Sequence, residues 1–105
     1  MNRGEVWWGE HPEAGRRPYL ILTRQQAIPV VTRVVAVPAT RTVRGIPTEV
    51  ILGEDDGMPE RCALSFDNIV TMPKGLFTSR ICRLGVDRLD QVCRALATAS
   101  GCSSV

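Results

Sequence analysis

The feature that most limits the fold of this chain is a series of short strand-like segments, separated by turn signals, that ends in a single helical pattern. The segments are rich in β-branched and aromatic residues, and Pro, Gly or a charged run lies between one segment and the next. Such a series predicts a small, curled antiparallel sheet or barrel. The predicted strands are residues 5–9, 17–23, 30–37, 48–52, 62–66, 69–72 and 79–84.

The helical pattern covers residues 86–99, where apolar residues recur at steps of three and one and therefore share one helical face. Asp87 would lie in the first turn, where the helix dipole favours a negative charge, and Gly101 would follow the last turn. The predicted fold class is therefore mainly β with a C-terminal α-helix packed on the sheet, and residues 103–105 are expected to fray. The residues predicted to face the sheet are Val86, Leu89, Val92, Cys93, Leu96 and Ala99.

The length of the chain supports one domain over residues 1–105, since a folded domain of this size buries roughly two-thirds of the surface that its unfolded chain exposes. No linker, internal repeat or low-complexity tract divides it. No apolar run approaches the ~18 residues needed to span a bilayer, and the first ten residues lack the apolar core of a signal peptide. We therefore expect a cytoplasmic protein that does not bind a membrane.

The cysteines do not form a metal-binding pattern. There is no Cys-x-x-Cys pair, and the single histidine, His11, cannot complete a zinc-finger arrangement. In a reducing cytosol the thiols are expected to be free and buried. We therefore predict no structural metal, no metal at the site and no cofactor. The four cysteines are Cys62, Cys82, Cys93 and Cys102.

The formal net charge of +2 results from opposite charges that are segregated along the chain. Residues 14–48 contain six arginines and no acidic residue, whereas residues 49–67 carry a net charge of −5. The basic stretch suits a polyanion or an acidic partner, and arginine's forked guanidinium suits phosphate and carboxylate groups. Codon bias in a GC-rich genome also explains a preference for arginine over lysine, but it does not explain the missing carboxylates.

Several common catalytic arrangements are excluded by the sequence. A single histidine rules out a His–His acid–base pair, and no nucleophile-elbow motif accompanies it for a Ser-His-Asp triad. Glycine-rich phosphate loops are absent. The acidic run Glu54–Asp56 favours a solvated turn over a divalent-metal site, because consecutive carboxylates in a turn point in different directions.

Two features in the basic stretch remain as candidates for chemistry. Arg17 lies between Arg16 and Pro18 at the start of a predicted strand, where a rigid backbone can hold its guanidinium against a phosphate. Thr40 follows the end of another predicted strand, where its hydroxyl can donate to a phosphoryl oxygen. A surface arginine and a loop-capping threonine are the alternative interpretation of these two residues.

Five segments, taken in chain order, resemble the signatures of the MazF/PemK toxin family. They extend over nearly the whole chain, and the order of the segments makes the resemblance specific although each motif is weak alone. The segments are Arg3–Trp8 (RGEVWW), Arg17–Leu22 (RPYLIL), Val35–Thr40 (VAVPAT), Ser65–Met72 (SFDNIVTM) and the C-terminal stretch Leu84–Leu96.

The resemblance implies a compact SH3-like barrel that forms a homodimer and acts as the toxin of a type II toxin–antitoxin system. It further implies a sequence-specific, metal-independent endoribonuclease that cleaves single-stranded RNA to 2′,3′-cyclic phosphate and 5′-hydroxyl ends, which inhibits translation and growth. By motif position, the family's catalytic arginine corresponds to Arg17 and its catalytic threonine to Thr40. Arg17 would then neutralise the charge of the phosphorane, and Thr40 would hydrogen-bond a non-bridging oxygen.

The resemblance also implies partners and further contacts. The inhibitor of such a toxin is a cognate antitoxin whose acidic segment, expected at its C-terminus, would cover the basic stretch. The proton acceptor for the 2′-hydroxyl is not identified; His11 has suitable chemistry, but we expect it to be a loop residue without a catalytic part. The arginines expected to contact the RNA backbone are Arg16, Arg24, Arg41 and Arg44.

The chain departs from the family pattern in the loop before Pro18. This loop usually carries a polar run with a glutamine, whereas here it is the short segment Gly15–Pro18. We expect the shorter loop to change substrate choice and to admit structured RNA such as tRNA or rRNA, with Arg16 replacing part of the lost contact.

Two other functions on the same fold remain alternatives. One is a gyrase poison that grips a protein, and the other is a nucleic-acid-binding module without catalysis; the presence of both Arg17 and Thr40 favours the enzyme. The adjacent Trp7 and Trp8 must face opposite sides of their strand, so one is expected in the core and the other near a groove or a dimer surface.

Overall fold

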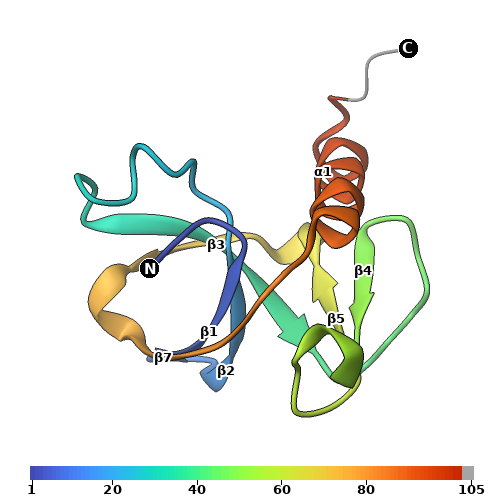
Figure 1. The fold of residues 1–105 in the computed structure, drawn as a ribbon, viewed down its shortest axis with the longest axis horizontal. Helices are drawn as coiled ribbons and strands as arrows, with labels where there is room; N and C mark the ends of the chain where they lie inside the picture. The colour runs from blue at the N-terminus through green and yellow to red at the C-terminus, as the bar shows by residue number, and fades with distance from the viewer. Residues whose placement is uncertain (103–105) are drawn as a thin grey trace.

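The computed structural model describes residues 1–102 and contains a curled β-sheet, three short 3₁₀ helices and one α-helix (Figure 1). The elements in chain order are β1 (Glu5–His11), β2 (Gly15–Ile21), β3 (Arg33–Thr40), β4 (Glu49–Leu52), η1 (Glu54–Asp56), β5 (Cys62–Ser65), η2 (Phe66–Asn68), β6 (Val70–Pro73), η3 (Lys74–Leu76), β7 (Phe77–Arg83) and α1 (Val86–Ser100).

Strand β3 joins the two parts of the sheet. The strand order is β4-β5-β3-β2-β1-β7, and β6 also pairs with β3, so that β3 has different neighbours along its length. Its first half, Arg33–Ala36, pairs with β6, Ala36–Pro38 pair with β2, and its last two residues, Ala39 and Thr40, pair with β5. Every pairing is antiparallel, and the sheet curls round on itself as predicted for a small SH3-like barrel (Figure 1).

The alternation of side chains along β2 and β3 divides the core into two clusters, one on each face of the sheet. Tyr19 and Ile21 of β2 pack in one cluster together with Val34 and Ala36 of β3. The residues between them, such as Leu20, face the other cluster, which lies under α1. Both strands are therefore buried on both faces and cannot shift register without exposing one of the clusters.

Helix α1 covers the second cluster with Val92 and Ala95, which are fully or almost fully buried. Asp87 lies in its first turn and Gly101 ends it in the left-handed conformation, as predicted. The predicted apolar face is wrong at two positions, because Val86 and Cys93 are exposed. The helix packs on β4 and the second cluster, while Val86 and Asp87 at its start are exposed (Figure 1).

The prediction of buried thiols is wrong for half of the cysteines. Cys62 is buried and Cys82 is half-buried, whereas Cys93 and Cys102 are exposed. All four are free, as expected. Cys93 is exposed because it lies on the side of α1 that faces away from the core, and Cys102 is exposed because it follows the end of the helix.

The strand boundaries differ from the predictions where turns intervene. The segment at 30–32 is not part of β3, since backbone hydrogen bonds from Ala27 to Arg24 and from Val30 to Ala27 form a turn and leave Val30 80% exposed. The acidic run Glu54–Asp56 is a 3₁₀ turn that Gly57 ends with φ of 94°. The prediction of fraying at residues 103–105 lies outside the described residues. Within residues 1–102, no helix has the length and apolar character that a bilayer-spanning segment needs.

Candidate active site

The two residues predicted to carry the chemistry line the same two hollows. The β2–β3 pairing reaches Tyr19 and Pro38, each of which is two residues from the predicted pair. Arg17 lies in the first half of β2, and Thr40 is the last residue of β3, where it pairs with Ala63 of β5. The sheet therefore brings together two side chains that are 23 positions apart in the sequence.

The hydroxyl group of Thr40 is oriented by the backbone. Its Oγ1 accepts a hydrogen bond from the amide of Thr42 at 3.2 Å. Because a hydroxyl can donate one proton while it accepts, the Thr40 proton stays available for a ligand oxygen. Among residues 1–102, no side chain or carbonyl accepts a hydrogen bond from the Arg17 guanidinium, which is half-buried. Both groups are thus free to bind an anion.

Two hollows meet at this pair. The larger, of about 410 Å³, is lined by Arg17 and Thr40 together with the Trp8, Arg16, Arg41 and Glu60 side chains. The smaller, of about 130 Å³, is lined by the same pair and by Pro38, Arg44, Ser65 and Asn68. A chain-like ligand with a phosphate at Arg17 and Thr40 would therefore have room for a neighbouring group on each side.

The thiol in the larger hollow does not supply a nucleophile. Burial raises the pKa of Cys62, and the nearby carboxylates of Glu60 and Asp56 raise it further. The thiol therefore stays protonated at neutral pH, where it is a poor nucleophile. Burial likewise raises the pKa of Tyr19, against the opposing charge of Arg17, so the phenol beneath the site stays neutral.

The tryptophans face opposite sides of β1, as the sequence predicts. Trp7 packs against the first core cluster and its Nε1 donates to the buried Glu5 carboxylate at 3.0 Å. Trp8 lines the larger hollow, and the guanidinium carbon of Arg16 lies 4.2 Å from the centre of its ring. This cation–π contact places the guanidinium of Arg16 over the Trp8 ring at the edge of the hollow.

The segment before β5 contributes a residue that sequence reasoning missed. Oε1 of Glu60 accepts from Nε of Arg41 at 2.6 Å, and both side chains line the larger hollow. Glu60 belongs to the acidic stretch that the sequence sets apart from the basic one, and no local motif marks it. Only the pairing of β5 with the end of β3 shows that it lies near Thr40.

The other predicted arginines divide into two groups. Arg16 and Arg41 line the larger hollow, and Arg44 lines the smaller one. Arg24 lies in the turn after β2 and lines neither hollow. His11 also lies outside both; it is the last residue of β1 and pairs with Gly15, so its predicted place in a loop is wrong. Its Nδ1 accepts from the amides of Glu13 and Ala14 in the turn that follows.

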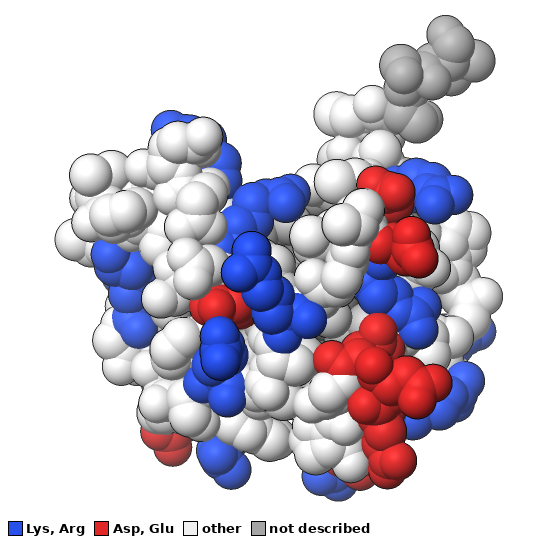
Figure 2. All heavy atoms as spheres, in the orientation of Figure 1, with Lys and Arg blue, Asp and Glu red and all other residues white. Residues whose placement is uncertain are grey.

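The acidic stretch forms a patch in the folded protein. Figure 2 shows the largest acidic cluster on this face at the lower right, in the region of η1, whereas basic side chains are spread over the rest of the face. Part of the acidic patch is neutralised, since Arg88 of α1 donates to Asp56 of η1 at 2.9 Å. Among the described residues, no group of three or more His, Cys, Asp or Glu side chains is arranged to hold a metal ion.

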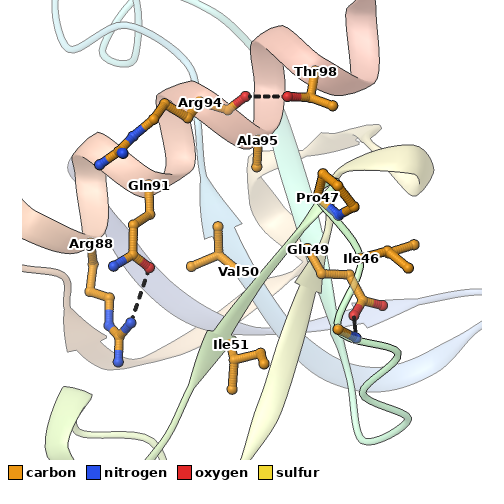
Figure 3. A pocket seen from close by; sticks show the side chains of 11 residues that line it. Ile46, Pro47, Glu49, Val50, Ile51, Arg88, Gln91, Arg94, Ala95 and Thr98 are labelled. Atoms are coloured by element: carbon orange, nitrogen blue, oxygen red, sulfur yellow. Dashed lines mark hydrogen bonds between the residues drawn. The ribbon is translucent and has the colours of Figure 1, made fainter.

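A further groove of about 550 Å³ lies between α1 and the chain that leads into β4 (Figure 3). Its lining includes Arg88 and Gln91, which are hydrogen-bonded to each other, and Glu49, which accepts from the amides of Arg44 and Gly45. Arg17 and Thr40 are not among its lining residues. The candidate pair therefore belongs to the smaller hollows described above.

Comparison with known proteins identifies close relatives along the whole chain. Residues 2–99 match the family described as PemK-like, MazF-like toxin of type II toxin-antitoxin system. The chain is 40% identical over 102 residues to a probable endoribonuclease, MazF5, of Mycobacterium tuberculosis, which covers 96% of this chain and 94% of that protein.

Solved structures agree with the sequence relatives. An endoribonuclease in complex with its cognate antitoxin, from a mycobacterial species, superimposes with a TM-score of 0.88 at 30% identity and covers 100% of this chain and 99% of that one. The Mycobacterium tuberculosis toxin MazF-mt6 gives a TM-score of 0.86, also at 30% identity, over 92% of this chain and 96% of that chain.

Proposed function

The chain belongs to the PemK-like, MazF-like toxins of type II toxin–antitoxin systems. We propose that it is an endoribonuclease that cleaves single-stranded RNA without a metal ion, with Arg17 and Thr40 as its catalytic residues. The observation that supports this function is that an unpaired guanidinium, that of Arg17, and a backbone-oriented hydroxyl, that of Thr40, line the same two hollows. The relatives named as endoribonucleases support the same reaction class.

In the proposed reaction the RNA supplies its own nucleophile. The 2′-hydroxyl oxygen attacks the adjacent phosphorus, the bond from phosphorus to the 5′-oxygen breaks, and a 2′,3′-cyclic phosphate and a 5′-hydroxyl result. Negative charge grows on the non-bridging oxygens in the transition state, where Arg17 neutralises it and Thr40 donates a hydrogen bond. Because these donors are fixed by paired strands, they need little reorganisation during the reaction.

The shape of the site suits a single strand. A phosphate at the pair would have the larger hollow on one side and the smaller hollow on the other, and Arg16, Arg41 and Arg44 would contact the backbone or bases on either side. The predicted loop Gly15–Pro18 is part of β2, and residues 12–14 alone connect β1 to β2. So short a connection supports the proposal that folded RNA such as tRNA or rRNA is also admitted.

The gyrase-poisoning and non-catalytic alternatives are less well supported by the site. A surface that only grips a partner does not need the pairing of a free guanidinium with a free hydroxyl proton. The expected biological setting is a cytoplasmic homodimer whose activity inhibits translation and growth. A cognate antitoxin with an acidic segment would cover the basic stretch of residues 14–48.

The test is incubation of the purified protein with total RNA in EDTA, followed by mapping of the 5′-hydroxyl ends by sequencing. We expect new ends at a recurring short sequence, formed without added metal. A matched preparation of Arg17→Ala should give none of these ends. Ends that appear only after addition of magnesium would contradict the proposed reaction, as would an unchanged pattern with Arg17→Ala.

A further inference from the structure

We infer that Glu60 reads a nucleobase next to the scissile phosphate and selects a base that carries an amino group over uracil. The inference rests on the proposed function, because it assigns the specificity of that same site. It makes Glu60 a specificity residue of the larger hollow, without a part in the bond-breaking step.

The position of Glu60 follows from the pairing of β5 with the end of β3. Thr40 is paired with Ala63, and Glu60 precedes β5 in the segment that leads into this pair. The side chains of Glu60 and Thr40 consequently line the same hollow of about 410 Å³. Glu60 is the only acidic residue among the lining residues of that hollow within residues 1–102.

The carboxylate of Glu60 is available to a ligand. Its ion pair with Arg41 joins two side chains that are 54% and 85% exposed, respectively. Exposed pairs of this kind contribute little to stability and are screened by salt. An RNA phosphate can therefore draw Arg41 away, and the Glu60 carboxylate is then left in the hollow with both oxygens free to accept hydrogen bonds.

A flat surface for the base lies in the same hollow. Arg16 lies over the ring of Trp8, with 4.2 Å between its guanidinium carbon and the ring centre. Unstacked RNA bases pack on aromatic rings and on guanidinium planes, and they are distinguished by hydrogen bonds to their edges. Stacking on Arg16 and Trp8 holds any of the four bases, so hydrogen bonds to the Glu60 carboxylate determine which base is preferred.

A carboxylate only accepts hydrogen bonds when it is ionised. Cytosine and adenine present one amino group each, and guanine presents an amino group beside its ring N–H, so all three can donate to Glu60. Uracil has no amino group; the single N3–H on its pairing edge lies between two carbonyl oxygens, so a carboxylate that accepts from it is held against at least one carbonyl oxygen, which repels it. Uracil is therefore the base that Glu60 rejects.

The test is cleavage of a pool of random-sequence RNA in EDTA, with sequencing of the 5′-hydroxyl ends and comparison of base frequencies at each position around the cut. For the unmodified protein we expect uracil to be disfavoured by about tenfold at one nucleotide flanking the cut, the size of one good edge contact. Glu60→Ala should reduce this preference to less than about twofold, and Glu60→Arg should reverse it in favour of uracil and guanine, whose edge carbonyls accept from a guanidinium, over adenine, which has none.

Matched variants separate base reading from charge. Glu54→Ala and Glu54→Arg make the same charge changes at an exposed residue of η1 that does not line the hollow, and they should leave every base frequency unchanged. Arg41→Ala should weaken binding about equally for all sequences, because a phosphate contact carries no base information. A higher cleavage rate for Glu60→Ala with unchanged base frequencies would overturn the inference, since only charge would then be involved.

A binding measurement keeps this inference separate from the proposed reaction. Short oligonucleotides with 2′-deoxy sugars cannot undergo the proposed cleavage, and fluorescence anisotropy measures their affinity with each base placed in turn at each position. A base preference that Glu60→Arg reverses would support Glu60 even if no RNA were cut, in which case only the reaction would be wrong. Equal affinities for all four bases with the unmodified protein would overturn the inference even if cleavage were found.

Discussion

Arg17 of β2 and Thr40 of β3 line the same two hollows, two residues beyond the last β2–β3 pair, Tyr19 and Pro38. Both strands contribute residues to the two core clusters, so the sheet holds the backbones of the two residues in place. A phosphate that reaches one of these groups is therefore presented to the other. This relationship places the catalytic proposal on rigid elements rather than on a mobile loop.

Removal of the Thr40 hydroxyl should slow RNA cleavage while leaving the fold unchanged. Thr40→Val keeps the shape of the side chain but cannot donate to the phosphoryl oxygen, and we expect a rate about 10- to 100-fold lower. Thr40→Ser keeps the hydroxyl and should retain most of the activity. Single-turnover cleavage of an oligonucleotide measures both rates, and thermal unfolding checks the fold. Equal rates for the valine and serine variants would show that the hydroxyl has no such role.

The buried carboxylate of Glu5 should make stability depend on acid pH. Burial opposes its ionisation, but hydrogen bonds from Trp7, Asn2 and Arg80 outweigh this effect and lower the pKa of Glu5 from 4.5 to about 2. Because the pKa is lower in the folded state, the ionised carboxylate stabilises the fold at any pH above the pKa of the unfolded chain. This contribution is lost as the pH falls from about 4.5 towards 2. It amounts to about 3 kcal/mol at neutral pH.

The measurement is urea unfolding of the unmodified protein and of Glu5→Gln between pH 3 and pH 7. The difference in free energy of unfolding should be constant above about pH 5 and should shrink at lower pH. A difference that is the same at pH 3 and pH 7 would contradict the assigned pKa of Glu5.

The close approach of Tyr19 to β1 should make Gly9 intolerant of a side chain. A Cβ at Gly9 would lie 2.8 Å from Cδ2 of the Tyr19 ring and 3.3 Å from Cδ1 of Phe77. We expect Gly9→Ala to lower the free energy of unfolding by about 1–3 kcal/mol, because the rings are packed and cannot move freely. Gly75→Ala is the control, since a Cβ there meets nothing within 4 Å. Equal unfolding midpoints in urea for the two variants would exclude the steric effect.

The four thiols should differ in reactivity. Burial raises the pKa of Cys62, and burial together with the Asp56 and Cys62 charges raises the pKa of Cys82 to about 11, whereas Cys93 and Cys102 are exposed. Brief alkylation with iodoacetamide at pH 8, followed by peptide mass spectrometry, should modify Cys93 and Cys102 first. Unfolding in urea should make all four react. Early modification of Cys62 in the folded protein would be inconsistent with its burial.

Much of the fold could be predicted from the sequence because most strands carry their own local signals. The strands at β1, β2 and β4 to β7 lie within a few residues of their predicted positions, and the helix ends at Gly101 as expected. Val30 and Val31 have strand propensity but do not belong to β3. They lie in a turn that buries Ile28 in the first core cluster, and this packing outweighs their propensity. The buried face of the helix differs from the predicted one. Ala95 is buried in the core, and the prediction left it out because it considered mainly large apolar residues.

The site could be predicted only in part. Arg17 and Thr40 are recognisable one at a time, because each lies at the end of a strand in the basic stretch. That they line the same hollows depends on the pairing of β2 with β3, and the position of Glu60 depends on the pairing of β5 with β3; neither leaves a local pattern. The RNA contact predicted for Arg24 stays a prediction, and this residue lies in the turn after β2, outside both hollows.

The most direct test of the proposed reaction is the cleavage rate of one RNA oligonucleotide, containing the mapped site, in EDTA with the unmodified protein, Arg17→Ala and Arg94→Ala. Arg94 lies on α1 in the groove of Figure 3, so its variant removes the same charge away from the site. We predict 5′-hydroxyl products with the unmodified protein and with Arg94→Ala, and a rate at least about a hundredfold lower with Arg17→Ala. Equal rates for the two arginine variants, or products only with added magnesium, would contradict the account.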